Sequence, residues 1–170
     1  MKSLVLFLIC LLASALALVA KELEAVPIQF SAEVGDAFGH RYSVKLHDGE
    51  LLYLDLGNDH SDAKPITISP TRQQWRNFRT SLDGINVWNW LGSYGPPEGT
   101  VVVDGSGWSL KIQYSDKKIV SEGNNFYPDG DGKSARNNPT ATFIGFEDAI
   151  EKLIGGREFR AATYKESTPK

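Results

Sequence analysis

The sequence predicts an α+β fold, with an antiparallel sheet of about six to seven strands and two helices packed on it. Apolar and polar residues alternate through much of the first half of the chain, which is the period of a half-buried strand. In two later segments apolar residues recur at spacings of three and four, as on an amphipathic helix. Because strands, helix, strands and helix follow one another, we expect the helices to cover one face of a single sheet.

The first strands are expected to form an antiparallel meander over residues 28–34, 41–47, 51–56 and 66–68. The second strand places three apolar residues on one face: Tyr42, Val44 and Leu46. Asp48-Gly49 then suits a tight hairpin turn. The returning strand is expected to turn three leucines toward the core: Leu52, Leu54 and Leu56.

A helix is expected to begin after Ser69-Pro70, where Thr71 and Gln74 have the spacing of a capping box. Its apolar stripe consists of Trp75, Phe78, Leu82 and Ile85. Asp83-Gly84 supplies a stop signal. Three arginines lie off the stripe and are expected to face solvent: Arg72, Arg76 and Arg79.

Strand patterns return at 101–103, 108–114 and 119–122. The middle one is expected to point four apolar residues inward: Trp108, Leu110, Ile112 and Tyr114. A long loop rich in Gly, Asn, Asp and Pro is expected over 123–140. A closing helix over 141–154 follows, with Gly155-Gly156 as its stop.

The first twenty residues have the layout of a secretory signal peptide. Lys2 precedes an apolar run from Leu4 to Ala13, and small residues then offer cleavage after Ala17 or Ala20. The run is too short for a membrane span, which needs about 20 apolar residues. We therefore expect a secreted or periplasmic protein without a membrane anchor after cleavage. Its expected organisation is a signal peptide at 1–20, a single domain at 21–160 and a tail at 161–170.

The composition is that of an ordinary globular domain, with 41% hydrophobic and 23% charged residues. Cys10, the only cysteine, falls in the expected signal peptide, so the mature chain would be cysteine-free and stabilised by apolar packing. The formal net charge is −3, and removal of Lys2 would leave −4. This mildly acidic balance argues against a nucleic-acid partner, because phosphate binding needs concentrated basic side chains.

Two segments are candidates for a ligand-binding site, the aromatic stretch after residue 87 and the polar loop after residue 123. Alternation in Val87-Trp88-Asn89-Trp90 predicts that both tryptophans point the same way. Exposed rings beside asparagine amides would suit a sugar or a peptide, whereas buried rings would be core and lid. The candidate residues are Trp88, Trp90, Tyr94, Asn124, Asn125 and Tyr127.

Motifs for common catalytic and cofactor sites are not found. His40, His47 and His60 lack metal-ligand spacing, and Lys133 stands where a calcium loop beginning at Asp129 needs an oxygen ligand. The sequence has no GxSxG, GxGxxG or phosphate-binding loop, so we expect no metal, no cofactor and no catalytic residue of these types. Two carboxylate pairs keep a hydrolase open: Asp104 with Glu122, or Asp129 with Asp131.

Spaced motifs run through residues 69–155. They are Ser69-Pro70-Thr71 with Trp75 and Phe78, Leu82-Asp83, Val87-Trp88-Asn89-Trp90, Tyr94, Asp104-Gly105 with Trp108-Ser109-Leu110, and the segment from Ser121 to Pro128. This pattern resembles one in uncharacterised bacterial secreted proteins. The resemblance implies a bacterial origin and no particular activity.

These features favour a binding or accessory module without enzyme chemistry, with a protein or a glycan as its candidate partner. One alternative is a carboxylate-dependent hydrolase. A second is a carbohydrate- or peptide-binding domain built on Trp88 and Trp90. A third is a module that inhibits or escorts another exported protein.

Overall fold

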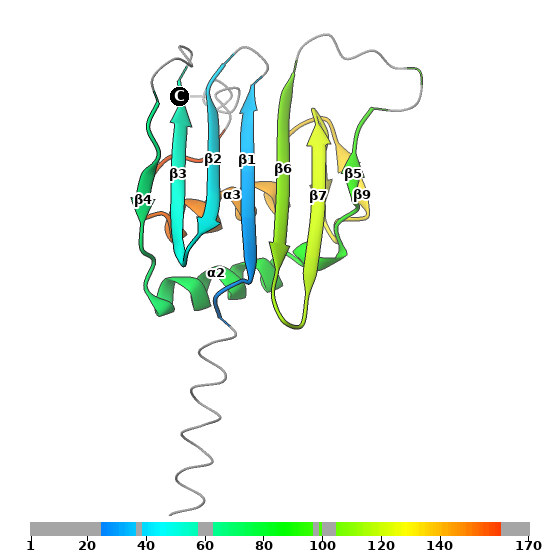
Figure 1. The fold of residues 1–170 in the computed structure, drawn as a ribbon. Helices are drawn as coiled ribbons and strands as arrows, with labels where there is room; N and C mark the ends of the chain where they lie inside the picture. Colours follow the sequence, from blue (N-terminus) through cyan, green and yellow to red (C-terminus); the bar gives the residue numbers. More distant parts are fainter. Residues whose placement is uncertain (1–24, 37–38, 58–62, 97–98, 100–104, 161–170) are drawn as a thin grey trace, which may run out of the picture.

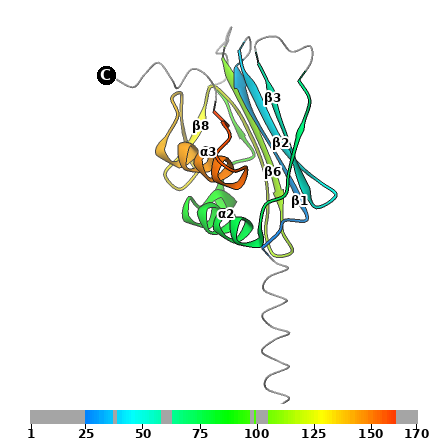
Figure 2. The same cartoon turned by 90° about the vertical axis from the view of Figure 1, so that its left-hand side faces the viewer.

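A computed structural model describes residues 25–36, 39–57, 63–96, 99 and 105–160. Seven strands form one sheet in the order β4-β3-β2-β1-β6-β7-β5, and its only parallel pair is β5 with β7. Two helices lie on one face of this sheet, and the opposite face, here called the open face, carries no helix of the described chain (Figures 1 and 2). The predicted class, strand number and one-sided helix layer are confirmed.

The strands are β1 (Gln29–Asp36), β2 (Arg41–His47), β3 (Glu50–Leu56), β4 (Ile66–Ile68), β5 (Ser93–Tyr94), β6 (Ser106–Gln113), β7 (Lys118–Asn124), β8 (Tyr127–Asp129) and β9 (Ser134–Arg136). The helices are α2 (Arg72–Gly84), α3 (Ala141–Leu153) and the short 3-10 helix η1 (Val87–Asn89). The predicted strand at 101–103, the signal peptide and the tail lie outside the described residues.

The meander is present, but the prediction that Leu52, Leu54 and Leu56 face the core is wrong. Val44 pairs with Tyr53, and partners across a sheet point to the same side. The buried face of β3 therefore carries Leu51 and Tyr53, which are 0% and 4% exposed. Residues 51–54 are all apolar, so alternation within β3 could not set its phase, and pairing with β2 does.

Both helices begin with side-chain caps. The Thr71 hydroxyl accepts a hydrogen bond from the Gln74 backbone N–H at 3.2 Å, and the Gln74 side chain accepts one from the Thr71 N–H at 2.8 Å, as the capping box predicts. Thr140 caps α3 through the Phe143 N–H. The two helices pack on each other and against the sheet. Neither helix of the described chain is long and apolar enough to cross a bilayer.

Aromatic rings fill the space between α3 and the half of the sheet that contains β6 and β7. Phe143 lies at their centre, with ring centroids 5.0 Å from Trp108, 4.8 Å from Tyr127 and 6.4 Å from Trp90. The predicted inward positions on β6 are confirmed, since Trp108, Leu110, Ile112 and Tyr114 are all buried. The segment expected to be one long loop contains the hairpin β8–β9, which its short strands and turn-rich composition concealed.

Candidate functional site

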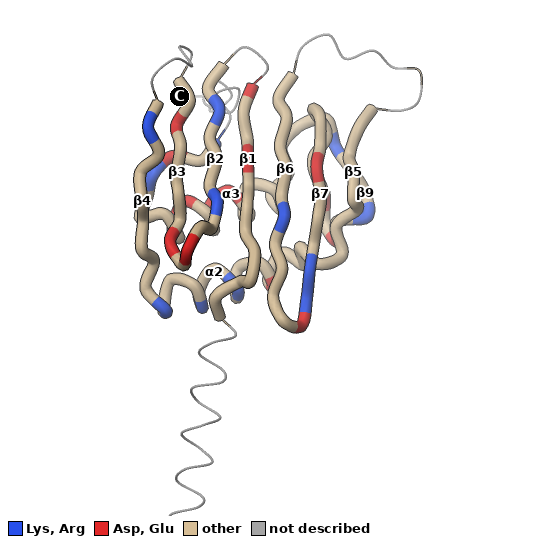
Figure 3. The backbone as a smooth tube through the Cα atoms, viewed as in Figure 1, with Lys and Arg blue, Asp and Glu red and all other residues tan. Residues whose placement is uncertain are grey.

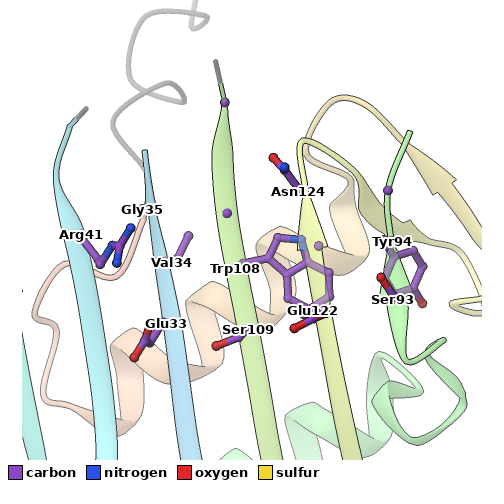
Figure 4. Close-up of a pocket in the computed structure, with 14 residues that line it drawn as sticks. Glu33, Val34, Gly35, Arg41, Ser93, Tyr94, Trp108, Ser109, Glu122 and Asn124 are labelled. Carbon is purple, nitrogen blue, oxygen red and sulfur yellow. The ribbon is translucent and has the colours of Figure 1, made fainter. Parts of the chain in front are cut away.

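The open face is hollowed near one end of β1, β6 and β7 (Figure 4). The cavity, here called the hollow, has a volume of about 520 Å³, which falls in the range of small-molecule sites. Five neighbouring strands and their flanking residues line it. The lining residues are Glu33, Val34, Gly35, Arg41, Ser93, Tyr94, Gly95, Gly105, Gly107, Trp108, Ser109, Glu122, Gly123 and Asn124.

Glycines create part of this space. Gly35 and Gly107 are direct partners on β1 and β6, so two neighbouring outward positions carry no side chain. A Cβ atom built on Gly107 would meet nothing closer than the Gly123 carbonyl oxygen at 3.9 Å, and one on Gly95 would meet nothing within 4 Å. Glycine inside a strand often marks a close approach to the backbone. Gly107 and Gly95 leave the backbone open to a ligand, whereas a Cβ atom on Gly35 would lie 2.8 Å from the Arg41 Cα atom, so Gly35 makes room for Arg41.

Two carboxylates stand in one row across the hollow. Glu33 on β1 pairs with Ser109 on β6, and Ser109 pairs with Glu122 on β7 (Figure 4). Neighbouring strands lie about 4.8 Å apart, which separates the two glutamate Cα atoms by about 10 Å. Both glutamates are exposed, and neither side chain has an ion-pair or hydrogen-bond partner within the described ranges.

A second row lies one step further along the strands. Arg41 pairs with Gly35, Gly35 with Gly107, and Gly107 with Asn124. Arg41 brings one positive charge and a planar fork of N–H donors, while Asn124 brings both a donor and an acceptor. Figure 3 shows acidic residues on β1 and β7, with β6 and its basic residue Lys111 between them. With Glu33 and Glu122 in the first row, the ionised side chains of the hollow sum to one negative charge.

The aromatic residues of the hollow lie beneath it and are held in place. Trp108 and Tyr94 are only 3% and 2% exposed. The Trp108 indole N–H donates to the Phe126 carbonyl oxygen at 2.9 Å. The Tyr94 hydroxyl accepts from the Leu91 N–H at 2.8 Å and donates to the Gly132 carbonyl oxygen. These rings support the floor and offer little face for stacking.

Of the six residues predicted to bind a ligand, the structure brings Tyr94 and Asn124 to the hollow. Trp90 and Tyr127 are 5% and 3% exposed and belong to the core. The Asn125 side chain accepts a hydrogen bond from the Ser106 backbone N–H at 2.8 Å, which is a local structural role.

The prediction that Trp88 and Trp90 point the same way is wrong. Residues 87–89 form η1, and a 3-10 helix has three residues per turn, so residues two apart diverge. Trp90 packs into the core against Phe146 and Trp108. Trp88 lies against Tyr114, with ring centroids 5.9 Å apart. The structure therefore divides the predicted aromatic site between two places.

Trp88 belongs to a cluster that ties α2 to the β6–β7 turn. The Arg79 guanidinium lies 4.9 Å from the Trp88 ring centre and 4.3 Å from that of Tyr114, and it binds both carboxylate oxygens of Asp116. The Arg79 side chain is 18% exposed, so the prediction that it faces solvent is wrong. Since each charge in the cluster is paired, this cluster is structural.

Asp83, the second acid of the cluster, also has hydrogen-bond and cationic partners. Burial acts to raise the pKa of Asp83, but hydrogen bonds from Trp88 and Lys117, together with the charge of Arg79, outweigh it and lower the pKa. The Trp88 indole N–H lies 2.6 Å from the Asp83 carboxylate. The Asp83 carboxylate is therefore held ionised as part of the cluster around Trp88 and Arg79.

Of the two carboxylate pairs predicted for a hydrolase, the first lies partly outside the described residues and the second takes part in a turn. Asp104 lies outside the described residues, while Glu122 lines the hollow. Asp129 pairs with Arg136, and the Asp131 carboxylate accepts from the Lys133 backbone N–H at 3.1 Å, so both serve the β8–β9 turn. Within the described ranges, no group of three or more His, Cys, Asp or Glu residues could hold a metal ion.

One buried acid lies outside the hollow. Glu147 on α3 is 0% exposed, and within the described chain neither of its carboxyl oxygens has a hydrogen-bond partner. Burial raises the pKa of Glu147 to about 9, against a lowering influence of Arg160, and Glu151 raises it further. The carboxyl group is therefore neutral at pH 7.

Sequence reasoning missed Glu33, Arg41 and Ser109 as site residues. Each is a polar residue on the outward side of an alternating strand, which by itself indicates only a solvated face. A usable signal was present in Gly35 and Gly107, because glycine within a strand pattern often marks a bulge or a close backbone approach.

Comparison with known proteins assigns no family. No protein-family model matches the chain, and no curated protein matches it. The case for a site is therefore the geometry of the hollow itself.

Proposed function

We propose that this protein is a small binding module without enzyme chemistry, exported by its signal peptide, which holds its ligand in the hollow. The observation that carries the proposal is a glycine-floored cavity whose rim presents carboxylates, hydroxyls, an amide and a guanidinium. An apolar core beneath fixes the backbone of these strands, so the polar groups are displayed in a set arrangement.

The chemistry of the lining favours binding over covalent catalysis. Ser93 and Ser109 are its only hydroxyl groups besides the hydrogen-bonded Tyr94. A serine nucleophile needs a neighbouring base, and the described lining contains no histidine or lysine.

The row of Glu33 and Glu122 favours a second candidate, a carboxylate-dependent hydrolase. In inverting glycosidases the two carboxyl groups stand about 6.5–9.5 Å apart, which side chains on Cα atoms about 10 Å apart can reach. Both glutamates are exposed on an open surface, whereas enzyme sites exclude water around the reacting groups. Binding therefore fits the geometry better.

A titration followed by ¹⁵N–¹H NMR tests the binding proposal. The panel contains L-arginine, the dipeptide arginyl-alanine, citrulline, maltotriose and alanyl-alanine at millimolar concentration. Amides of Gly35, Gly107 and Gly123 report on the hollow. We expect at least one compound to shift these amides selectively and saturably. If no compound in the panel changes the chemical shifts of these three amides, the proposal is overturned.

Two variants on β6 test whether the ligand binds in the hollow. Gly107→Phe fills open space in the hollow, whereas Gln113→Phe puts the same ring on the same face of β6 outside it. Binding should be lost in the first variant and kept in the second. Chromogenic glycosides added to the wild-type protein test the hydrolase, and product release that Glu33→Gln or Glu122→Gln abolishes would replace the binding proposal.

A further inference from the structure

We infer that the hollow takes an organic cation, a ligand whose ammonium or guanidinium group lies between Glu33 and Glu122. This inference rests on the proposed function and names the class of its ligand. It begins with the two acids of the first row, which are separated by Ser109 alone.

Neither of these acids has an ion-pair partner within the described chain. Several other surface carboxylates have cationic partners: Asp116 binds Arg79, Asp129 binds Arg136, and Asp83 binds Lys117. Glu33 and Glu122 have no such partner in the described ranges, although Arg41 stands one row away on one side and the exposed Lys111 of β6 one row away on the other. A cationic ligand would supply that direct partner, and N–H donors make their strongest hydrogen bonds to carboxylates.

The spacing of the acids suits an extended cation better than a metal ion. Glu33 and Glu122 are separated by two strand spacings, or about 10 Å between Cα atoms. A calcium ion takes six to eight oxygen ligands at 2.3–2.6 Å, which two distant carboxylates do not provide. A guanidinium or a primary ammonium carries several N–H donors and can bridge the two acids over Ser109.

Arg41 and Asn124 indicate what the rest of the ligand carries. They lie two residues further along the strands than the glutamates, or about 6.8 Å, on the same face. Arg41 binds carboxylates and carbonyl oxygens, and Asn124 can donate or accept. A cation joined by a short chain to a carboxyl or amide group matches both rows. A basic amino acid has this chemistry, either free or within a peptide.

The same surface is poorly suited to a neutral sugar. Sugar recognition by stacking needs an exposed aromatic face, and Trp108 and Tyr94 are 3% and 2% exposed. Gly107 instead leaves the strand backbone accessible, which suits a slender ligand lying along the strands.

The test compares L-arginine with citrulline, its neutral isostere, by the NMR titration described above. We expect arginine to shift the Gly35, Gly107 and Gly123 amides, with citrulline binding at least about tenfold more weakly. Glu33→Gln and Glu122→Gln should each weaken arginine binding about tenfold or more. Asp48→Asn removes a carboxylate from the β2–β3 turn and should leave binding unchanged. The dispersion of each spectrum confirms that the variant is folded.

The outcomes separate the inference from the proposed function. Equal binding of arginine and citrulline, or arginine binding that survives both glutamine variants, overturns the cation inference. If maltotriose shifts the amides of the hollow and arginine does not, the binding proposal stands and the cation inference is overturned. Tighter binding of arginyl-alanine than of arginine supports a peptide source, and the reverse supports a free amino acid.

Discussion

Gly123 and Trp108 occupy adjoining space on the buried side of the sheet. A Cβ atom on Gly123 would lie 2.3 Å from the indole nitrogen of Trp108 and 2.4 Å from the Phe126 carbonyl oxygen, the two atoms joined by the indole hydrogen bond. Gly107, next to Trp108 on β6, has the opposite surroundings, because its missing side chain opens the hollow. Gly123 is therefore required by the packing of Trp108, whereas Gly107 leaves space for a ligand.

Gly123→Ala should therefore destabilise the protein and Gly107→Ala should not. Overpacking beside an indole lowers the free energy of unfolding by about 1–3 kcal/mol. A Cβ on Gly107 meets open space and restricts the unfolded chain, so the change should be neutral or stabilising by up to about 1 kcal/mol. Urea unfolding of the two variants measures both, and equal midpoints would contradict the assigned contacts.

Tyr94→Phe should cost more stability than Tyr114→Phe. The Tyr94 hydroxyl satisfies the Leu91 N–H and the Gly132 carbonyl oxygen in a buried site, and an unsatisfied buried group costs about 1–3 kcal/mol. The Tyr114 hydroxyl is buried without a hydrogen-bond partner in the described chain, so its removal should be neutral or stabilising. Thermal unfolding compares the variants, and amide exchange at Leu91 should quicken only in Tyr94→Phe.

Arg79→Ala should lower the free energy of unfolding by about 1–3 kcal/mol. The guanidinium covers the Trp88 and Tyr114 rings and makes a two-pronged bond to Asp116, so packing and charge are lost together. Arg76→Ala is the matched control on the same helix, where the guanidinium bonds the exposed Gln73. A change within about 0.5 kcal/mol is expected there. Urea unfolding measures both variants. Similar losses in the two would show that the Arg79 cluster adds nothing to the free energy of unfolding.

Glu147 should make the protein less stable as pH rises. Burial penalises the charged form and raises the pKa of Glu147 from its ordinary value of 4.5 to about 9 in the folded chain. Between these values the folded state holds a proton that the unfolded state releases, so the contribution of Glu147 to stability is greatest below pH 4.5 and falls progressively toward pH 9. The total effect is on the order of a few kcal/mol.

Glu147→Gln separates this contribution from other titrations. The amide keeps the shape of the acid and cannot ionise, so the variant should gain stability over wild type as pH rises from 5 to 9. Midpoints of urea unfolding at three or four pH values give the comparison. A difference between the two proteins that does not grow with pH would refute the neutral buried acid.

Local chemistry predicted much of the fold. The Thr71–Gln74 capping box and the alternation of Trp108, Leu110 and Ile112 each depend on neighbours within a few residues, and the structure contains both. The phase of β3 was not predictable because residues 51–54 are apolar on both faces, so the decision falls to pairing with β2. Likewise, Val87 to Trp90 carries apolar residues compatible with a strand, and tertiary packing makes it a 3-10 helix.

The hollow was harder to predict, because it arises from pairing between distant segments. Glu33 and Ser109 meet only because β1 lies beside β6, and nothing in either segment specifies the other. Tyr94 and Asn124 were predicted as ligand residues on aromatic and amide chemistry, and the structure places both in the lining. Trp90 and Tyr127 carry the same kind of chemistry but fill the core, since composition does not distinguish a displayed ring from a buried one.

The central position of β1 has a consequence for biosynthesis. One neighbour, β2, emerges directly after it, but the other, β6, begins at Ser106. Until the ribosome releases that segment, Phe30, Ala32 and Val34 lack the strand that completes their side of the sheet. Closing so long a stretch of chain costs entropy and slows folding. The sheet therefore cannot be completed until well over half of the polypeptide has been synthesised.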